Sequence, residues 1–191
     1  FKTHLENVNL EKGVCEIYFF RGGYGGLSFV EDGLANHCFL VKAEAVKNLG
    51  GDAEKIVKKL IFENERAYQT MKDSKPVFDW LAVSVDGFGA KDLSPAENLL
   101  AVGDAAAFID PFTGSGMLMA FESAKILARS ISENENSFAE IARRYSERHH
   151  KNFRKRLRIC AIMRHAAFAP RLADWIIPVL SLNKKTIEFL A

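Results

Sequence analysis

The sequence lacks several features that mark secreted, membrane-spanning or highly charged proteins. It has only three cysteines, Cys15, Cys38 and Cys160, without CxxC spacing, which favours a reducing cytoplasm over a disulfide framework. We expect each thiol to act as a small buried apolar group. No uninterrupted apolar run reaches the roughly 20 residues that cross a bilayer. With 26 basic and 24 acidic residues the net charge is only +2, which points to no particular partner.

The length and composition are those of a folded chain, because 191 residues with 48% hydrophobic content can bury a substantial core. We expect an α+β chain with three regions. Residues 1–90 are predicted to form a mixed, largely antiparallel sheet with one helix. Residues 91–131 are predicted to form a strand–loop–helix segment, and residues 132–191 a helical region.

The predicted sheet is based on short runs bounded by turn signals. Glu31-Asp32-Gly33 separates two of these runs, and we expect the runs on either side to be neighbouring antiparallel strands. Asp52 is placed to cap a helix that continues to about Met71, because apolar residues follow it at helical spacing. The runs that predict strands are Val14–Phe20, Tyr24–Val30, Ala35–Val41 and Phe78–Val85.

The most informative part of the chain begins with a short apolar run, Leu99–Val102. The run ends in Gly103 and is typical of a buried strand. Asp104 follows at the point where the chain would leave the sheet. After a loop, apolar residues recur at helical spacing, which predicts a helix with one apolar face. These residues are Met117, Leu118, Phe121, Ala124, Leu127, Ala128 and Ile131.

The loop between this strand and this helix has the residues of a ligand-binding turn. Pro111 stiffens it, and Gly114 and Gly116 remove side chains just before the helix begins. A helix N-terminus offers unpaired N–H groups and the positive end of the helix dipole. Without side chains on the two glycines, a ligand can approach those groups closely. The alternative is a tight strand–helix connection that holds no ligand.

The order Gly-Asp-Ala, then Pro, then Gly-x-Gly opening a helix resembles a known motif. It is the second flavin-binding motif of FAD-dependent oxidoreductases, as found in aromatic-hydroxylase-type flavin monooxygenases and geranylgeranyl reductases. The resemblance implies FAD as the cofactor, with NAD(P)H as a candidate reductant. The matching residues are Gly103, Asp104, Ala105, Pro111, Gly114 and Gly116.

The resemblance also implies roles for individual residues around the flavin. Asp104 would accept a hydrogen bond from the ribityl chain. Gly114, Ser115, Gly116 and Met117 would face the N1/O2 edge of the isoalloxazine, where the helix dipole stabilises negative charge.

One motif of the resembling family is missing from this chain. The family opens with a dinucleotide-binding fold that carries GxGxxG, and the glycines of residues 22–26 follow no strand–helix pattern of that kind. We therefore interpret the chain as the C-terminal part of a larger flavoprotein, inactive alone, whose N-terminal FAD-binding domain is absent. Residues 1–90 would be its substrate-binding sheet. The alternative is a non-catalytic remnant that binds an apolar ligand or a membrane surface without FAD.

Three residues of the predicted sheet domain are candidates for a substrate pocket: Tyr24, His37 and Trp80. Geranylgeranyl reductases carry a Pro-x-x-Tyr-x-Trp-x-Phe-Pro signature, of which Tyr24 is the only match, because Arg21 and Gly26 replace the Pro and the Trp. The expected substrate is a small apolar or aromatic molecule, and hydroxylation and double-bond reduction both stay open. The alternative for each candidate is a side chain packed on its strand neighbours.

The run Arg143–Arg164 is dense in Lys and Arg. It predicts either a solvated helix face or peripheral contact with an anionic membrane, so we expect a cytoplasmic protein with a candidate membrane-facing surface. No interleaved aromatic residues suggest base stacking, so we expect no nucleic acid partner. His149 and His150 are adjacent rather than four residues apart, and no metal site is predicted.

Overall fold

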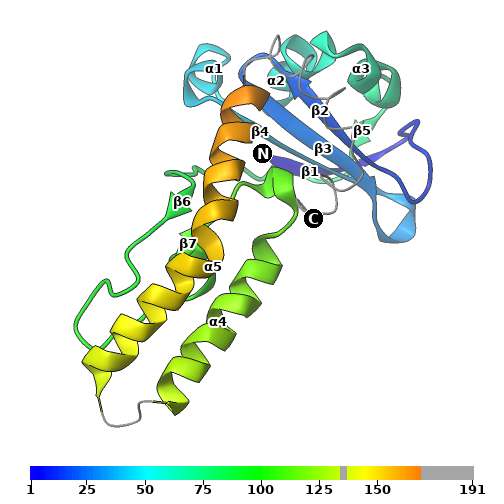
Figure 1. Cartoon of the computed structure of the whole chain (residues 1–191). Coiled ribbons are helices and arrows are strands. Elements are labelled where there is room, and N and C mark those ends of the chain that lie inside the picture. Colours follow the sequence, from blue (N-terminus) through cyan, green and yellow to red (C-terminus); the bar gives the residue numbers. More distant parts are fainter. Residues whose placement is uncertain (134–136, 169–191) are drawn as a thin grey trace. The chain divides into compact units, whose positions relative to one another are not determined.

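The computed structural model describes residues 1–133 and 137–168 of the chain (Figure 1). They form two compact units, the first Phe1–Ser84 with residues 166–168, and the second Val85–His165. Both units combine helices with antiparallel strands, which confirms the predicted α+β class. The part of the predicted helical region beyond residue 168 lies outside the described residues.

The first unit is built on a five-stranded antiparallel sheet with the strand order β2-β3-β4-β1-β5. Three predicted strands and their antiparallel pairing are confirmed, and the predicted turn Glu31–Gly33 is a single turn of 3-10 helix. The strands are β1 (Lys2–Glu6), β2 (Cys15–Phe20), β3 (Gly23–Phe29), β4 (Ala35–Val41) and β5 (Lys75–Pro76).

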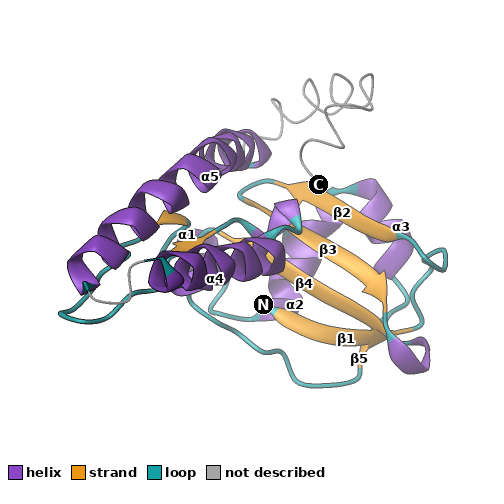
Figure 2. Ribbon diagram, turned by 60° about the horizontal axis from the view of Figure 1, so that its bottom comes forward, coloured by secondary structure: helices purple, strands orange, loops and turns teal. Residues whose placement is uncertain are grey.

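Helices α2 and α3 cover one face of this sheet (Figure 2), and the core of the unit lies beneath them. Leu27 pairs with His37 across β3 and β4, and both side chains are buried on the helix-covered face. Because neighbouring strand residues point to opposite faces, Cys38 lies on the other face and is exposed. Cys15 is exposed as well, so the prediction of a buried thiol is wrong for these two cysteines and correct for Cys160.

The single helix predicted for this unit is broken into shorter pieces. Asp52 is the predicted N-cap and accepts a 3.1 Å hydrogen bond from the Lys55 N–H. Asn64 starts a second helix, because its side-chain oxygen accepts from the Ala67 N–H while its amide donates to the Phe19 carbonyl on β2. The helical elements are α1 (Ala43–Asn48), α2 (Ala53–Lys59), a 3-10 turn (Ile61–Glu63) and α3 (Glu65–Met71).

The predicted strand Phe78–Val85 is wrong, because the chain bulges out of register after the two residues of β5. Leu5 pairs with Pro76, whereas Lys2 pairs with Leu81. Five residue steps on this edge segment therefore lie opposite three on β1, and two residues are in excess. An insertion of this kind interrupts the ladder and bends the strand.

The second unit has little sheet and two long helices. The predicted buried strand Leu99–Val102 is wrong, because Leu99 is 52% and Val102 37% exposed, and this run pairs mainly through the Ala101 N–H and the Leu93 carbonyl. An apolar run becomes a buried strand only where other strands flank it. The elements are β6 (Gly89–Ala90), β7 (Ala107–Phe108), 3-10 turns (Gly103–Ala105, Pro111–Thr113), α4 (Gly116–Ser132) and α5 (Phe138–Ala167).

Helices α4 and α5 run side by side (Figures 1 and 2), but the apolar face predicted for α4 is largely exposed. Met117 is 77% and Phe121 76% exposed. The buried positions of α4 are instead Met119, Ser123 and Ser130. The helical period was therefore predicted correctly, while the side on which α4 packs was not. This unit has two small hydrophobic clusters, one of Ala107, Ile109, Met119, Phe153 and Cys160 and one of Leu93, Ala106 and Tyr145.

Candidate functional site

The first half of the predicted flavin motif forms a turn packed tightly on α4. Gly103 has a φ of +60° and donates its N–H to the Ser123 hydroxyl at 2.8 Å. A Cβ at this position would lie only 3.3 Å from the Cβ of Ala120. Glycine is thus required here by both backbone conformation and close approach. Asp104 follows directly, and its side chain is exposed.

The second half of the motif is a hydrogen-bonded loop that leads into α4. Asp110 caps the 3-10 turn by accepting from the Phe112 N–H at 3.1 Å, and Pro111 occupies its first position. The Thr113 hydroxyl donates to the Asp110 carbonyl at 3.1 Å and lies 2.9 Å from the Ser115 hydroxyl. Asp110 was not singled out from the sequence, although an Asp-Pro pair is a regular signal for a helical cap followed by the first position.

The two glycines of this loop differ in what the fold requires. Gly114 has a φ of +64° and ends the 3-10 turn in the left-handed conformation. Gly116 is the first residue of α4, and a Cβ there would lie 3.6 Å from the Ile109 side chain, an ordinary contact. The fold therefore accommodates the methyl group of an alanine at residue 116. A glycine at that position leaves the start of α4 open to a neighbouring group.

The N-terminus of α4 can interact with a polar or anionic edge. Ser115 is the N-cap residue and makes no side-chain capping bond, and the Met119 N–H donates to the Ser115 carbonyl at 3.0 Å. The N–H groups of the first turn, before Met119, point along the axis at the positive end of the dipole. Met117 stands beside them with 77% of its surface exposed.

The three candidate substrate residues do not lie on one face of the sheet. Tyr24 points to the face opposite the helices, where its ring is near Phe19 and Phe168, each at 6.3 Å between centroids. His37 lies on the helix-covered face and is fully buried. Trp80 joins it there, with ring centroids 5.9 Å apart. The structure brings His37 and Trp80 together and separates Tyr24 from them.

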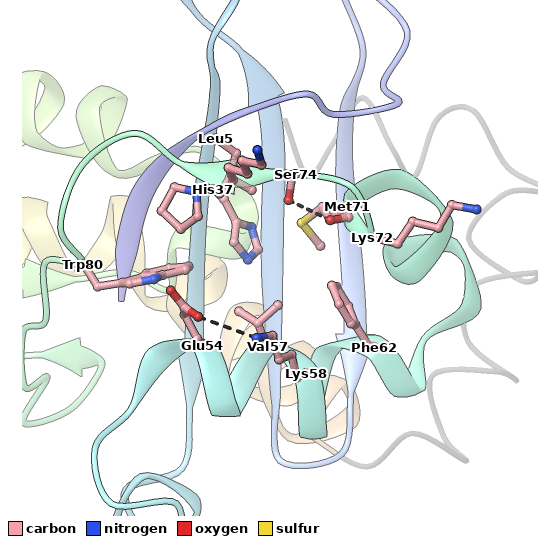
Figure 3. A pocket seen from close by; sticks show the side chains of 12 residues that line it. Leu5, His37, Glu54, Val57, Lys58, Phe62, Met71, Lys72, Ser74 and Trp80 are labelled. Atoms are coloured by element: carbon pink, nitrogen blue, oxygen red, sulfur yellow. Dashed lines mark hydrogen bonds and ion pairs between the residues drawn. The ribbon is translucent and has the colours of Figure 1, made fainter.

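A cavity of about 270 Å³ lies between the sheet and the helices of the first unit (Figure 3). The bulged edge segment is held to β1 by the Thr3 hydroxyl, which donates to the Phe78 carbonyl at 2.7 Å, and this segment carries Trp80 to the cavity. The apolar part of the wall is formed by Leu5, Val57, Phe62, Met71 and Trp80.

Two buried polar atoms in this cavity wall lack a hydrogen-bond partner, the His37 Nε2 and the Trp80 Nε1. His37 Nδ1 lies 3.1 Å from the Gly26 carbonyl, so it carries the proton and donates, which leaves Nε2 as an acceptor. Burial lowers the pKa of His37 to about 4, and the bond to Gly26 only partly opposes this shift. The imidazole is therefore neutral near pH 7.

The basic run on α5 is partly neutralised by Glu147 within it and by Glu133 and Glu140 before it. Arg143 pairs with Glu140 and Glu147, whereas Arg148 reaches Glu133 near the end of α4. A shallow depression on α5 keeps five basic side chains on one face: His150, Lys151, Arg154, Lys155 and Arg158.

Other types of site were also sought in the described part of the chain. Within residues 1–133 and 137–168, no three His, Cys, Asp or Glu side chains gather as a metal site would require. None of the described helices is both long and apolar enough to cross a membrane.

Comparison with known proteins gives one clear relative in sequence. No protein-family model matches the chain. Digeranylgeranylglycerophospholipid reductase 2 of Methanopyrus kandleri is 27% identical over an alignment of 161 residues, which covers 79% of this chain and 39% of the reductase. The chain thus spans about two fifths of the length of this relative.

Solved structures of flavoproteins share the fold. The flavin-dependent brominase Bmp2 has a TM-score of 0.72 at 11% identity, covering 99% of this chain and 48% of the brominase. The myxobacterial FAD-dependent halogenase CndH has a TM-score of 0.61 at 21% identity, covering 80% of this chain and 37% of the halogenase. Together with the sequence relative, these likenesses confirm the predicted resemblance to the FAD-dependent oxidoreductase family that includes the geranylgeranyl reductases.

Proposed function

We propose that the chain is part of an FAD-dependent oxidoreductase, in which the second unit forms one side of the flavin site. The observation that carries this proposal is Gly116, where the helical backbone allows a Cβ at ordinary contact distance from Ile109. The fold does not require glycine at the first position of α4. A glycine there is explained by a ligand that must closely approach the N–H groups of the first turn. Flavin supplies the redox chemistry when it is bound.

The residues of the chain would hold and polarise the flavin. The exposed carboxylate of Asp104 would accept a hydrogen bond from a ribityl hydroxyl. Gly114, Ser115, Gly116 and Met117 would border the N1/O2 edge, where the first-turn N–H groups of α4 stabilise negative charge. Gly103 and Pro111 would hold the two halves of the motif in place.

A further domain would complete this site. The large apolar side chains of Leu99, Val102, Met117 and Phe121 are exposed in the second unit. Groups of large exposed apolar side chains mark contact sites with other domains or proteins. We infer that a dinucleotide-binding domain covers them, which agrees with the 39% of the archaeal reductase that the chain spans.

For the substrate we favour a small apolar molecule. The sequence relative is named a reductase of a geranylgeranyl lipid, which favours double-bond reduction over hydroxylation, with NAD(P)H as the reductant. Arg21 and Gly26 replace the Pro and Trp of the geranylgeranyl reductase signature, so the substrate need not be the same lipid.

For location we favour the cytoplasm, with peripheral contact at a membrane. Cys15, Cys38 and Cys160 are all unpaired, as a reducing compartment requires. The basic face of α5, which includes Lys151, Arg154 and Arg158, is the surface that would meet anionic headgroups.

The proposal is tested on the longest protein that the gene encodes around this chain. We expect that protein to purify with FAD, while the 191-residue chain alone is colourless and binds FAD weakly. Asp104→Ala should weaken FAD binding about 10- to 100-fold, because a charge-assisted hydrogen bond contributes roughly 1.5–3 kcal/mol. The measurement is flavin fluorescence.

The matched control is Asp86→Ala, which removes an exposed aspartate of the same unit outside the motif. It should leave the dissociation constant unchanged. If Asp104→Ala behaves like the control, the role of Asp104 is wrong. If the longer protein binds no flavin, the non-catalytic alternative replaces the proposal.

A further inference from the structure

We propose that the cavity beneath the sheet of the first unit is a binding site for a small uncharged molecule with an apolar body and a hydroxyl group. The inference is independent of the flavin site, because every residue that carries it belongs to the first unit.

The two buried nitrogens define the polar part of the ligand. His37 Nε2 is an acceptor and Trp80 Nε1–H is a donor, and neither has a partner. A buried polar atom without a partner costs roughly 1–3 kcal/mol, so these two groups favour a molecule that satisfies both. A hydroxyl is the smallest group that does so, because it donates one hydrogen bond and accepts another. His37 and Trp80 both line this cavity, and their rings lie edge to face with 5.9 Å between centroids.

The rest of the cavity defines the apolar body. Val57 lies near the His37 ring, and Phe62 lies near Met71 on the side of the cavity away from Trp80 (Figure 3). Water alone is a poor filling for these walls, because each buried water needs two to four polar partners. The volume of about 270 Å³ is ample for a single-ring alcohol.

The charges in and around the cavity exclude a ligand with an ionic group next to His37, at the inner end of the cavity. His37 is neutral near pH 7, so an anion would meet no cation there and would pay the cost of leaving water. Lys58 lies at the rim and pairs with Glu54 at 3.6 Å (Figure 3). Lys72 and Lys75 also line the rim but are exposed.

The sheet itself makes room for this arrangement at Gly25. A Cβ there would lie 3.0 Å from the Phe39 Cβ and 3.5 Å from the His37 ring. Glycine at this position allows the imidazole to lie close to β3, where it reaches the Gly26 carbonyl.

The test compares two ligands of nearly equal size on the 191-residue chain. The chain is labelled with ¹⁵N and titrated with benzyl alcohol and with toluene, while the indole N–H signal of Trp80 is followed. Trp80→Phe assigns that signal against the other tryptophan, Trp175. We expect a saturable shift with benzyl alcohol and about tenfold weaker binding of toluene, as hydrogen bonds to the hydroxyl predict. No saturable shift, or equal affinity for the two ligands, would overturn the proposal.

A pair of variants tests the role of His37 Nε2 as the hydrogen-bond acceptor. His37→Phe keeps an aromatic ring but removes Nε2, and should weaken benzyl alcohol binding about tenfold without changing toluene binding. His4→Phe is the matched control on the opposite face of the same sheet, and should bind both ligands like the wild type. If His37→Phe binds benzyl alcohol as tightly as the wild type, the assigned role is wrong. If that variant fails to fold, the comparison of the two ligands on the wild type decides.

Discussion

The two units of this chain are stabilised in different ways. The first closes one core, in which side chains from the long strands meet Ile56, Ile61 and Met71 from the helical side. The second has only small clusters, and the buried positions of α4 include Ser123 and Ser130. Several large apolar side chains of this unit are exposed, Met117 and Phe121 among them.

The contrast shows which unit depends on a neighbour. Burial of apolar surface is the main source of stability, and the first unit achieves it with its own residues. In the second unit, ion pairs such as Arg148–Glu133 and Arg156–Glu122 link α4 to α5. Exposed pairs of this kind contribute little, typically up to about 1 kcal/mol each. We infer that the second unit reaches its full stability only when its apolar surface is covered.

The largest expected effect is a difference in stability between two truncations, one in the core of the first unit and one on the exposed side of α4. Leu27 is 1% exposed, so Leu27→Ala should lower the free energy of unfolding by about 2–5 kcal/mol through lost burial and a cavity. Phe121 is 76% exposed, and Phe121→Ala should change the free energy of unfolding by less than about 0.5 kcal/mol. Urea unfolding measures both. A large loss for Phe121→Ala would mean that the apolar surface of α4 is covered in the chain alone.

A second effect concerns acid stability of the first unit. The pKa of His37 is lowered from 6.5 to about 4, so between these values the unfolded chain binds a proton that the folded chain does not. Stability is therefore highest above about pH 6.5 and falls as the pH drops towards 4, by roughly 2–3 kcal/mol. His37→Phe should remove this part of the pH dependence. Unfolding curves near pH 7 and pH 4.5 test this prediction. Equal losses of unfolding free energy in the variant and the wild type would contradict it.

The smallest effect separates two glycines of the proposed flavin motif, Gly103 and Gly116. Gly103→Ala should destabilise the chain by about 1–2 kcal/mol, because its φ is +60° and Ala120 is close. Gly116→Ala should change stability by no more than about 0.5 kcal/mol, since the backbone there is helical and the added methyl group would make an ordinary 3.6 Å contact with Ile109. Thermal unfolding of the two variants compares them. A collapse on Gly116→Ala would make that glycine a structural requirement and weaken the flavin assignment.

Local signals in the sequence predicted the parts of the fold that depend on neighbouring residues. The strands β2, β3 and β4, the turn Glu31–Gly33 and the cap at Asp52 are of this kind. The break of the predicted helix depends on a distant residue instead, because Asn64 is held by the Phe19 carbonyl, 45 residues away in the sequence.

The predicted sites were limited by the same lack of long-range information. Helical spacing identified the apolar side of α4, but no pattern within one helix says whether another element covers it. Tyr24 was a pocket candidate through its match to the reductase signature, and His37 through its place in a predicted strand of the same sheet. Their opposite faces follow only from the register that pairs Leu27 with His37, and register is set across strands.

The bulge between Pro76 and Leu81 also determines how this sheet meets other molecules. A straight edge strand offers its free N–H and C=O groups to any extended chain and so invites aggregation. Here regular pairing on the outer side of β1 stops after two residues, one of them a proline that has no N–H. The segment that brings Trp80 inward thereby leaves the outer edge without a continuous template, which discourages strands of other molecules from adding to the sheet.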